Sequence, residues 1–150
     1  MNEFKPFEDK LAGLIASLSP AARRRMTAEI AKQLRTSQQQ RIKRQQAPDG
    51  TPYAARKLQP VKGKKGRVKR EMFTKLRTNR YMKAKGTDST AVVEFVGRVQ
   101  RMAQVHQEGL RDKPNRYSEG VQYETRTLLG MNQENKKDIE SVFVKYLSLS

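Results

Sequence analysis

The stretch TAVVEFVGRVQRMAQVHQEG, residues 90–109, is apolar in both halves and predicts the centre of the fold. Residues 91–96 are mostly β-branched or aromatic and include only Glu94 as a charged group, which predicts a strand buried on both faces. The second half predicts a helix, because apolar side chains and a histidine recur at the spacing of one helix face. The residues on that face are Val99, Met102, Ala103, His106 and Leu110. Gly109 suits the left-handed position that commonly ends a helix.

The composition around this stretch predicts a small core with long solvated segments. Of 150 residues, 35% are apolar and 31% are charged, against a usual apolar share of about 45–50%. A chain of this length is expected to form a single domain. The lack of cysteine excludes disulfides and thiolate metal sites, and one histidine is too few for an ordinary structural zinc site. No apolar run approaches the ~20 residues of a membrane helix, and the N-terminus lacks a signal peptide's apolar centre, so we expect a cytoplasmic protein.

The positive charge is concentrated in one part of the chain. The formal net charge is +17, and residues 19–89 account for all of it. Within this part, residues 47–89 hold thirteen basic and three acidic side chains. A run of charges is often only a solvated face, but such a density repels itself unless an anionic partner relieves it. The pattern therefore predicts that this region meets either nucleic-acid phosphate or an acidic protein surface, and the residues leave both open.

Two helices are predicted before this basic region. The first covers residues 4–18 and carries the apolar face Phe4, Phe7, Leu11, Leu14, Ile15 and Leu18. The second begins at Ser19-Pro20, a good N-cap and first-turn pair, and runs to about Gln45. Its buried side is expected to contain Met26, Ile30, Leu34 and Ile42. Because residues 38–46 are almost wholly polar, we expect the far end to project from the core or to meet a partner.

The basic segment begins after a turn. The residues Pro48-Asp49-Gly50 are typical of a turn. Residues 53–70 show no periodic spacing of apolar side chains, which predicts a mobile basic arm that is ordered only against a partner. Gly63 and Gly66 do not form a nucleotide loop, since no strand precedes them and no Lys-Ser/Thr pair follows. The cations expected to bind the anionic partner are Arg56, Lys57, Lys62, Lys64, Lys65, Arg67, Lys69 and Arg70.

The remaining segments complete an α+β domain. We expect a short helix at 71–76, a hairpin whose turn is 85–89, a loop at 110–120 and a third strand at 121–125. After Asn132, a final helix is predicted from the face Ile139, Val142, Phe143, Tyr146 and Leu147. The predicted organisation is one domain, 1–150, with a helical part (1–46), a basic arm (47–70) and an α+β core (71–150). The fold class is α+β, with N-terminal amphipathic helices, a small antiparallel sheet with a core helix, and a C-terminal helix.

No active site is predicted. His106 would need a nearby carboxylate or nucleophile to act as a base, and no spacing supplies one, so a structural role is the preferred interpretation. The acidic residues are scattered, which leaves no cluster for the metal ions of a nuclease. We therefore expect neither an enzyme nor a cofactor, a metal or a small-molecule substrate.

Four motifs in sequence order resemble the phage virion morphogenesis family. They are the segment from Gln40-Arg41 to Pro48-Asp49-Gly50-Thr51-Pro52-Tyr53, the basic stretch to Leu76, Val105-His106-Gln107-x-Gly109, and Arg126-x-Leu128-Leu129-Gly130. The resemblance covers essentially the whole chain. It implies a structural protein at the head-proximal end of a contractile tail, which finishes the tail and makes it competent to join a DNA-filled head.

The resemblance also implies partners and a location. Related neck and tail-completion proteins form rings, often of six subunits, so the expected partners are copies of this chain, the tail terminator and the neck or head-completion proteins. The basic arm would face packaged DNA or bind acidic surfaces of adjoining rings, and His106, Gln107, Gly109, Leu128 and Leu129 would determine the fold or subunit contacts. The protein would be found in the host cytoplasm during assembly and then in the virion tail or neck. The alternative function is a non-sequence-specific nucleic-acid-binding protein that uses residues 56–85.

Overall fold

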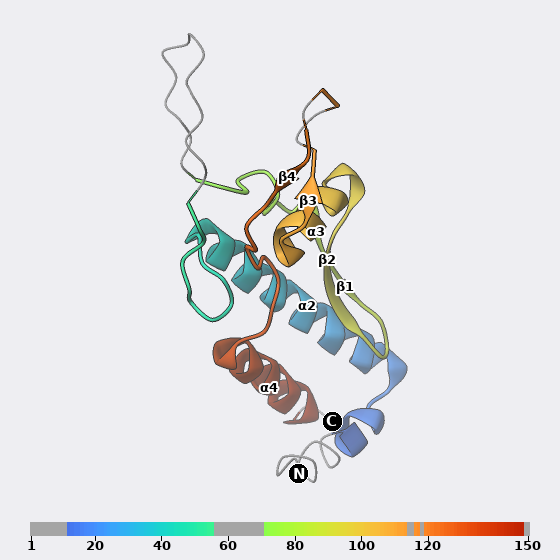
Figure 1. Ribbon diagram of the computed structural model, residues 1–150. Coiled ribbons are helices and arrows are strands. Elements are labelled where there is room, and N and C mark those ends of the chain that lie inside the picture. Colours follow the sequence, from blue (N-terminus) through green and yellow to red (C-terminus); the bar gives the residue numbers. More distant parts are fainter. Residues whose placement is uncertain (1–11, 56–70, 114–115, 118, 149–150) are drawn as a thin grey trace. The chain divides into compact units, whose positions relative to one another are not determined.

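The computed structural model describes residues 12–55, 71–113, 116–117 and 119–148 (Figure 1). Residues 12–16 are helical, and the named elements then follow in chain order. They are α2 (Pro20–Lys43), β1 (Met82–Gly86), β2 (Ala91–Phe95), η1 (Gly97–Val99), α3 (Gln100–Glu108), β3 (Arg111–Asp112), β4 (Val121–Gln122) and α4 (Gln133–Ser148). Among the described residues the strands form two antiparallel pairs, β1 with β2 and β3 with β4, so the predicted α+β class is confirmed.

Helix α2 begins and ends where the sequence predicts. The Ser19 hydroxyl accepts a hydrogen bond from the Ala22 backbone N–H at 3.1 Å, which caps the first turn, and Pro20 occupies the first helical position. After Lys43 the chain leaves the helix, and Gln45 adopts a left-handed conformation with φ of 59°. The predicted turn at 47–52 is also present, because the Gly50 N–H donates to the Ala47 carbonyl at 2.9 Å.

The far end of α2 does not project from the core, which corrects the first of the two alternatives expected for residues 38–46, while contact with a partner stays a prediction. Gln38 and Arg41 are each only 4% exposed, and Ile42 is fully buried. Both polar side chains form hydrogen bonds to the backbone of Gly130. A polar helix face can therefore be buried here because a distant segment supplies the donors and acceptors.

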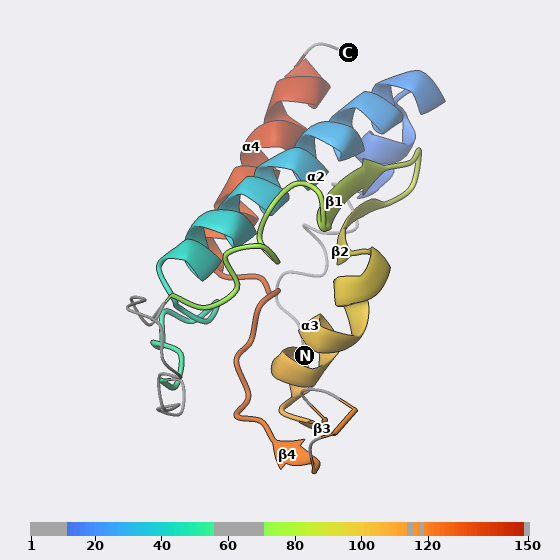
Figure 2. The ribbon, with the colours of Figure 1, turned by 90° about the horizontal axis from the view of Figure 1, so that it is seen from above.

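The described chain divides into two compact units, each built from several segments. The first unit combines residues up to Thr36 with 83–94 and 133–150, and the second combines 37–82 with 95–132. In the first unit, α4 lies alongside the early turns of α2 in both views (Figures 1 and 2). The core of this unit contains Leu18, Met26, Ile30 and Val142.

Around this core lie partly buried side chains that include the predicted α4 face: Ile139, Phe143, Tyr146 and Leu147. The predicted helix at 4–18 is described only from residue 12 onward, and there Leu14 is exposed while Ile15 and Leu18 pack inward. Phe4, Phe7 and Leu11 lie outside the described residues. The apolar period therefore predicted the packing of α4 correctly. It predicted wrongly that Leu14 would be buried.

The predicted hairpin is present, with one difference in burial. Strands β1 and β2 pair, and the Thr87 N–H donates to the Thr90 carbonyl at 2.8 Å across the turn. The hairpin contacts α2 within the first unit, where the Thr27 hydroxyl donates to the Thr87 carbonyl. Val92 is exposed, so the expectation that β2 is buried on both faces is wrong at this position. A two-stranded pair leaves one face partly open to solvent.

Helix α3 ends at the predicted glycine but buries a different face. Gly109 is left-handed with φ of 64°, and its N–H donates to the Val105 carbonyl. Val99 and Ala103 are buried as expected, but Met102 is 49% exposed and Val105 is buried in its place. The helix is short and follows the 3-10 turn η1, and within it the buried residues are Ala103 and Val105.

Two further predictions in the second unit need correction. Residues 71–76 form turns rather than a short helix, although Met72 and Leu76 are buried. The expected third strand at 121–125 is reduced to the two residues of β4, which pairs with β3 inside the predicted loop and not with the β1–β2 hairpin. Beyond β4, residues 123–128 run without regular structure. Their backbone groups find other partners, which are described below.

Candidate functional site

The eight cations predicted to bind an anionic partner, from Arg56 to Arg70, lie outside the described residues. The structure does describe the chain that leads into this basic segment and the chain that leaves it. Both belong to the second unit. We call these two stretches, residues 53–55 and 71–73, the root of the basic segment.

Side chains from distant positions hold the entry side of the root. The Tyr53 hydroxyl donates to the Thr127 carbonyl at 3.0 Å, and the Tyr53 N–H donates to the Gln45 carbonyl at 2.8 Å. Burial raises the pKa of Tyr53 to about 12, against a smaller opposing effect of the Arg41 charge, so the phenol keeps its proton and remains a donor. The next two carbonyls bind the guanidinium of Arg126, which is nearly buried: Nε donates to the oxygen of Ala54 at 2.9 Å and Nη2 to that of Ala55 at 3.2 Å.

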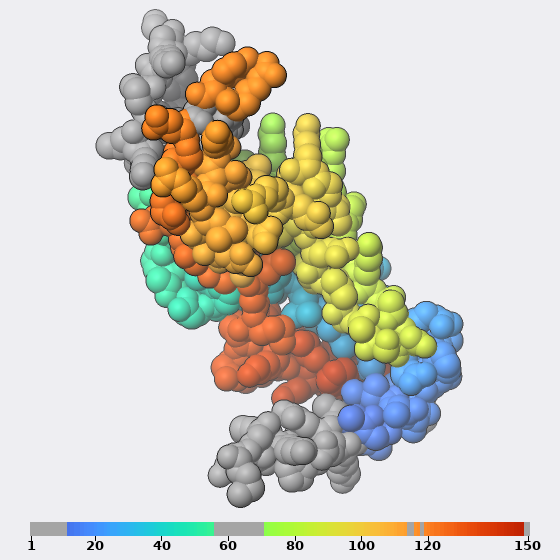
Figure 3. Space-filling view, turned by 45° about the vertical axis from the view of Figure 1, so that its right-hand side comes forward, coloured from blue at the N-terminus to red at the C-terminus, as the bar shows by residue number. Residues whose placement is uncertain are grey.

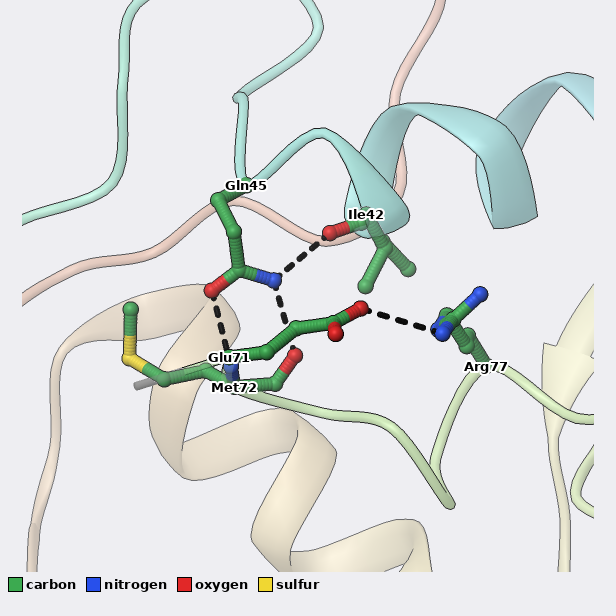
Figure 4. Close-up of polar contacts among 5 residues, drawn as sticks. All are labelled: Ile42, Gln45, Glu71, Met72 and Arg77. Atoms are coloured by element: carbon green, nitrogen blue, oxygen red, sulfur yellow. Dashed lines mark hydrogen bonds and ion pairs between the residues drawn. The ribbon is translucent and has the colours of Figure 1, made fainter. Parts of the chain in front are cut away.

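One glutamine holds the exit side. Figure 4 shows the side-chain amide of Gln45 facing the backbone of Met72. Its Oε1 accepts from the Met72 N–H at 2.8 Å, and its Nε2 donates to the Met72 carbonyl at 2.9 Å and to the Ile42 carbonyl at 2.8 Å. Glu71 is fixed as well, by an ion pair of 3.0 Å with Arg77. The amide thus bonds to the backbone of the exit stretch as the backbone of a neighbouring strand would.

An aromatic row joins the two sides of the root. The rings of Tyr53 and Phe73 meet edge to face with centroids 5.7 Å apart. Phe73 in turn contacts His106 at 4.8 Å, and His106 contacts Tyr123 at 5.1 Å. Phe73 reaches this position with φ of 66°, a conformation that a bulky residue adopts only when its surroundings enforce it. The two ends of the basic segment are therefore fixed against each other and against α3.

The residues predicted to determine the fold or subunit contacts also meet in this unit. The Gln107 side chain binds the backbone of Leu128 and Leu129, and the backbone N–H of Arg126 donates to the His106 carbonyl at 2.8 Å. A Cβ atom at Gly109 would collide with the Thr125 side chain, so glycine is required both for its left-handed φ and for this close approach. Leu128 is fully buried. Their role in contacts between subunits stays a prediction.

The helix α2 holds the last residue of the same segment. The Gly130 N–H donates to Gln38 Oε1 at 3.1 Å, and Arg41 Nη2 donates to the Gly130 carbonyl at 2.7 Å. Arg41 also donates to Gln38, which orients both side chains. On the other side of Gly130, a Cβ atom would lie 2.6 Å from Pro48 Cγ. Residues 126–130 are thus held by side chains from α2, α3 and the 53–55 stretch.

The predicted site residues did not include Arg126, Gln45, Gln38 or Tyr53. Three of the four motifs used for the resemblance contain contact partners in this network, namely Arg41 with Pro48 and Tyr53, His106 with Gln107, and Arg126 with Gly130. The motif positions themselves were therefore the signal that could have identified Arg126 and Tyr53. Gln45 and Gln38 carried no comparable signal, because they stand in glutamine runs, 45–46 and 38–40, in which no single position is distinctive.

No group of three or more His, Asp or Glu side chains within residues 12–55, 71–113, 116–117 and 119–148 could hold a metal ion. In the same described parts, no helix has the length and apolarity needed to cross a membrane. The arrangement holds a segment in place and contains no reacting groups.

Comparison with known proteins agrees with the motifs. Residues 2–148 match the sequence model of the phage virion morphogenesis family. The chain is 49% identical over 148 residues to tail completion protein S of Escherichia phage P2, and the aligned part covers 98% of this chain and 99% of that protein. No solved structure matches the chain.

Proposed function

The chain belongs to the phage virion morphogenesis family, and from this membership we propose that it completes the head-proximal end of a contractile phage tail and enables head–tail joining. It is a structural protein of virion morphogenesis and not an enzyme. The observation that carries the proposal is identity of 49% along practically the whole length of a tail completion protein. Identity of this level over two nearly equal lengths supports a common fold for the two chains.

We infer that the protein works as a ring of identical subunits, with six as the expected number, between the tail terminator and the neck or head-completion proteins. Its place would be the host cytoplasm during assembly and the virion tail or neck afterwards. The built root supports a contact role for the basic segment, since two guanidinium bonds to residues 54 and 55 and two amide bonds to Met72 fix the chain on either side of it. The eight cations of residues 56–70, with no acid among them, would bind acidic surfaces of adjoining rings or packaged DNA.

The test begins with electron microscopy of a lysate from a phage whose gene for this chain carries an early stop codon. Full heads and unjoined tails, with joining restored by the supplied protein, are the expected result. Normal infectious particles from that lysate would contradict the proposal. A light-scattering mass measurement of the purified protein then tests the ring, because a monomer at all concentrations and in the presence of tails would exclude it.

Supplying variants in the same lysate tests the basic segment. Changing Lys62, Lys64 and Lys65 to Glu reverses three charges, and we expect it to abolish joining. The matched control changes the same three residues to Arg, which keeps the charge and should keep joining. Full joining by the glutamate variant would remove the basic segment from the proposal while leaving tail completion in place.

The alternative function, non-sequence-specific nucleic-acid binding through residues 56–85, is favoured by the same charge. Salt dependence separates the two. A phosphate binder loses affinity steeply as salt rises, whereas a ring contact with buried apolar area loses less. A stop-codon lysate with normal particles, together with steep salt dependence of DNA binding, would favour the alternative.

A further inference from the structure

A second cationic cluster lies in the described part of the second unit. It consists of Tyr81 with Lys75, Arg80 and Arg98, and we call it the Tyr81 cluster. Tyr81 directly precedes β1, while Arg98 lies in η1 just after β2. The Val96 N–H donates to the Tyr81 carbonyl at 2.8 Å, so pairing of the hairpin brings the two positions together. Figure 3 shows the green and yellow atoms of these two segments side by side on the surface.

The side chains of the cluster are organised around the tyrosine ring. Arg98 Nη2 donates to the Tyr81 hydroxyl oxygen at 2.9 Å. The guanidinium carbons of Arg80 and Arg98 lie 5.3 Å and 5.9 Å from the ring centroid, within the range of cation–π contact. The hydrogen bond from Arg98, followed by the charges of Arg80, Arg98 and Lys75, lowers the pKa of Tyr81. A phenol hydroxyl can both accept, as here from Arg98, and donate to a further acceptor.

No carboxylate of the described residues balances these charges. The ion pairs found there join Arg77 to Glu71, Lys85 to Glu94, Arg101 to Asp112 and Lys145 to Glu29. Lys75, Arg80 and Arg98 take part in none of them, and all three are exposed. Cations held together at one ring repel each other, and an anion that binds several of them at once would remove this cost.

We propose that the Tyr81 cluster is a binding site for the phosphodiester backbone of nucleic acid. Two guanidinium groups offer paired donors that suit phosphate oxygens, and an ammonium and a phenol add further donors nearby. An aromatic ring among arginines is also the combination that sequence-tolerant nucleic-acid-binding grooves use, because bases stack on rings and on guanidinium planes. An acidic protein surface would use the cations but not the ring. This assignment depends neither on residues 56–70 nor on the proposed role in tail completion.

Fluorescence anisotropy tests the site, using the purified full-length protein and a short labelled DNA duplex of mixed sequence. The test variant is Arg80→Gln with Arg98→Gln. Its matched control is Lys136→Gln with Lys137→Gln, which removes two exposed charges from α4 in the other unit. Affinity is measured over a series of salt concentrations. Circular dichroism melting of each variant shows whether the fold is kept.

We expect the arginine variant to bind at least about tenfold more weakly at low salt and to lose about two units from the slope of log affinity against log salt. The lysine control should change affinity by less than about twofold, since long-range charge alone is screened. Tyr81→Phe keeps the ring but removes the hydroxyl, and we expect an intermediate loss. Equal slopes for the arginine variant and the lysine control, with both folded, would overturn the proposal.

Competition with poly-L-glutamate distinguishes the two kinds of polyanion. Under the proposal, poly-L-glutamate displaces the labelled duplex far less well than unlabelled DNA at the same charge concentration. If it competes equally, and the arginine variant loses both ligands to the same degree, the cluster is a general acidic-surface site and the phosphodiester assignment is wrong. Head–tail joining in the lysate assay is a separate readout, so failure here leaves the proposed function standing.

Discussion

Gln107 and Leu129 exchange two hydrogen bonds across 22 positions of the chain: Oε1 of the glutamine accepts from the Leu129 N–H at 3.0 Å, and its Nε2 donates to the Leu129 carbonyl at 2.9 Å. The same Oε1 accepts from the Leu128 N–H at 2.8 Å. One side chain on α3 therefore satisfies three backbone groups of a segment that belongs to no sheet. Such a segment depends on individual side chains where a strand would depend on a neighbouring backbone.

Replacing Gln107 by Met tests this dependence. Methionine has a similar volume but leaves three backbone groups unpaired, so we expect the free energy of unfolding to fall by about 3 kcal/mol. Urea denaturation followed by circular dichroism measures the change. Gln104→Met on the exposed side of the same helix is the control and should lie within about 0.5 kcal/mol of the parent protein. A similar effect at both positions would show that the amide contributes little.

The contact between Gly130 and Pro48 predicts a paired rescue. In Gly130→Ala the new methyl group would meet Pro48 Cγ at 2.6 Å, and we expect a loss of about 1–3 kcal/mol from overpacking. Combining it with Pro48→Ala removes the obstructing ring and should recover part of the loss beyond additivity. Gly13→Ala, which has no neighbour within 4 Å, is the control and should be neutral or slightly stabilising. Strict additivity of the two changes would contradict a direct clash.

Arg126→Lys tests the anchor of the entry side of the root. Lysine keeps the charge but cannot bind the carbonyls of Ala54 and Ala55 with two fixed donors, so we expect a loss of about 1–3 kcal/mol in urea denaturation. The exposed Arg111→Lys serves as the control, with an expected change below about 0.5 kcal/mol. If the basic segment works from a fixed root, Arg126→Lys should also reduce head–tail joining in the lysate assay. If the destabilised variant joined heads to tails normally, anchoring of the root by Arg126 would not be needed for joining.

The ion pair between Glu29 and Lys145 predicts a pH dependence in the first unit. Lys145 Nζ donates to both carboxylate oxygens, at 2.9 and 3.2 Å, and this bond, followed by one from Tyr146, lowers the pKa of Glu29. Since the folded pKa is below the unfolded one, the stabilisation is present above the unfolded pKa of about 4.5 and is lost as pH falls through the folded pKa. The pair is partly exposed, so its contribution is small.

Glu29→Gln should therefore lower the urea midpoint at about pH 7 and have a smaller effect at about pH 3, because protonation of the parent carboxylate as pH falls removes its attraction for Lys145. The control is Glu140→Gln, an exposed position on α4, for which we expect the same small change at both pH values. An effect of Glu29→Gln that is equal at the two pH values would assign the contribution to packing and not to charge.

The regular elements could be predicted because their signals are local. A Ser-Pro cap starts α2, an apolar period gives α4, and glycine closes α3, so sequence neighbours alone determine these features. The family could be recognised for a related reason, since its motifs are short and contiguous. Prediction was weaker for which face of a short helix or strand is buried, as the exposed Met102 and Val92 show. A short element contains too few helical turns or strand pairs to determine its buried face from the sequence.

The root and the 126–130 segment could not be predicted from the chain alone. Their stability comes from side chains that bond backbone groups far away in sequence, as Gln45 bonds Met72 and Gln38 bonds Gly130. Such bonds leave no periodic pattern in the sequence. The polar residues that form them cannot be distinguished there from polar residues exposed to solvent. For that reason the polar end of α2 was expected to project, although its glutamine and arginine are buried against their partners.

The edge-to-face contact of Tyr53 with Phe73 has a consequence for how this protein can change over time. Because the chain on both sides of residues 56–70 is fixed to the body, and the two sides contact each other, we expect changes in the length or content of that stretch to affect folding little. Lengthening a closed loop costs only about 0.6 kcal/mol for each doubling, so insertions and exchanges should be tolerated there. The stretch should therefore be replaceable as a unit. Recombination between phages could replace it, or an experimenter could place an epitope in it, and the rest of the protein would keep its structure.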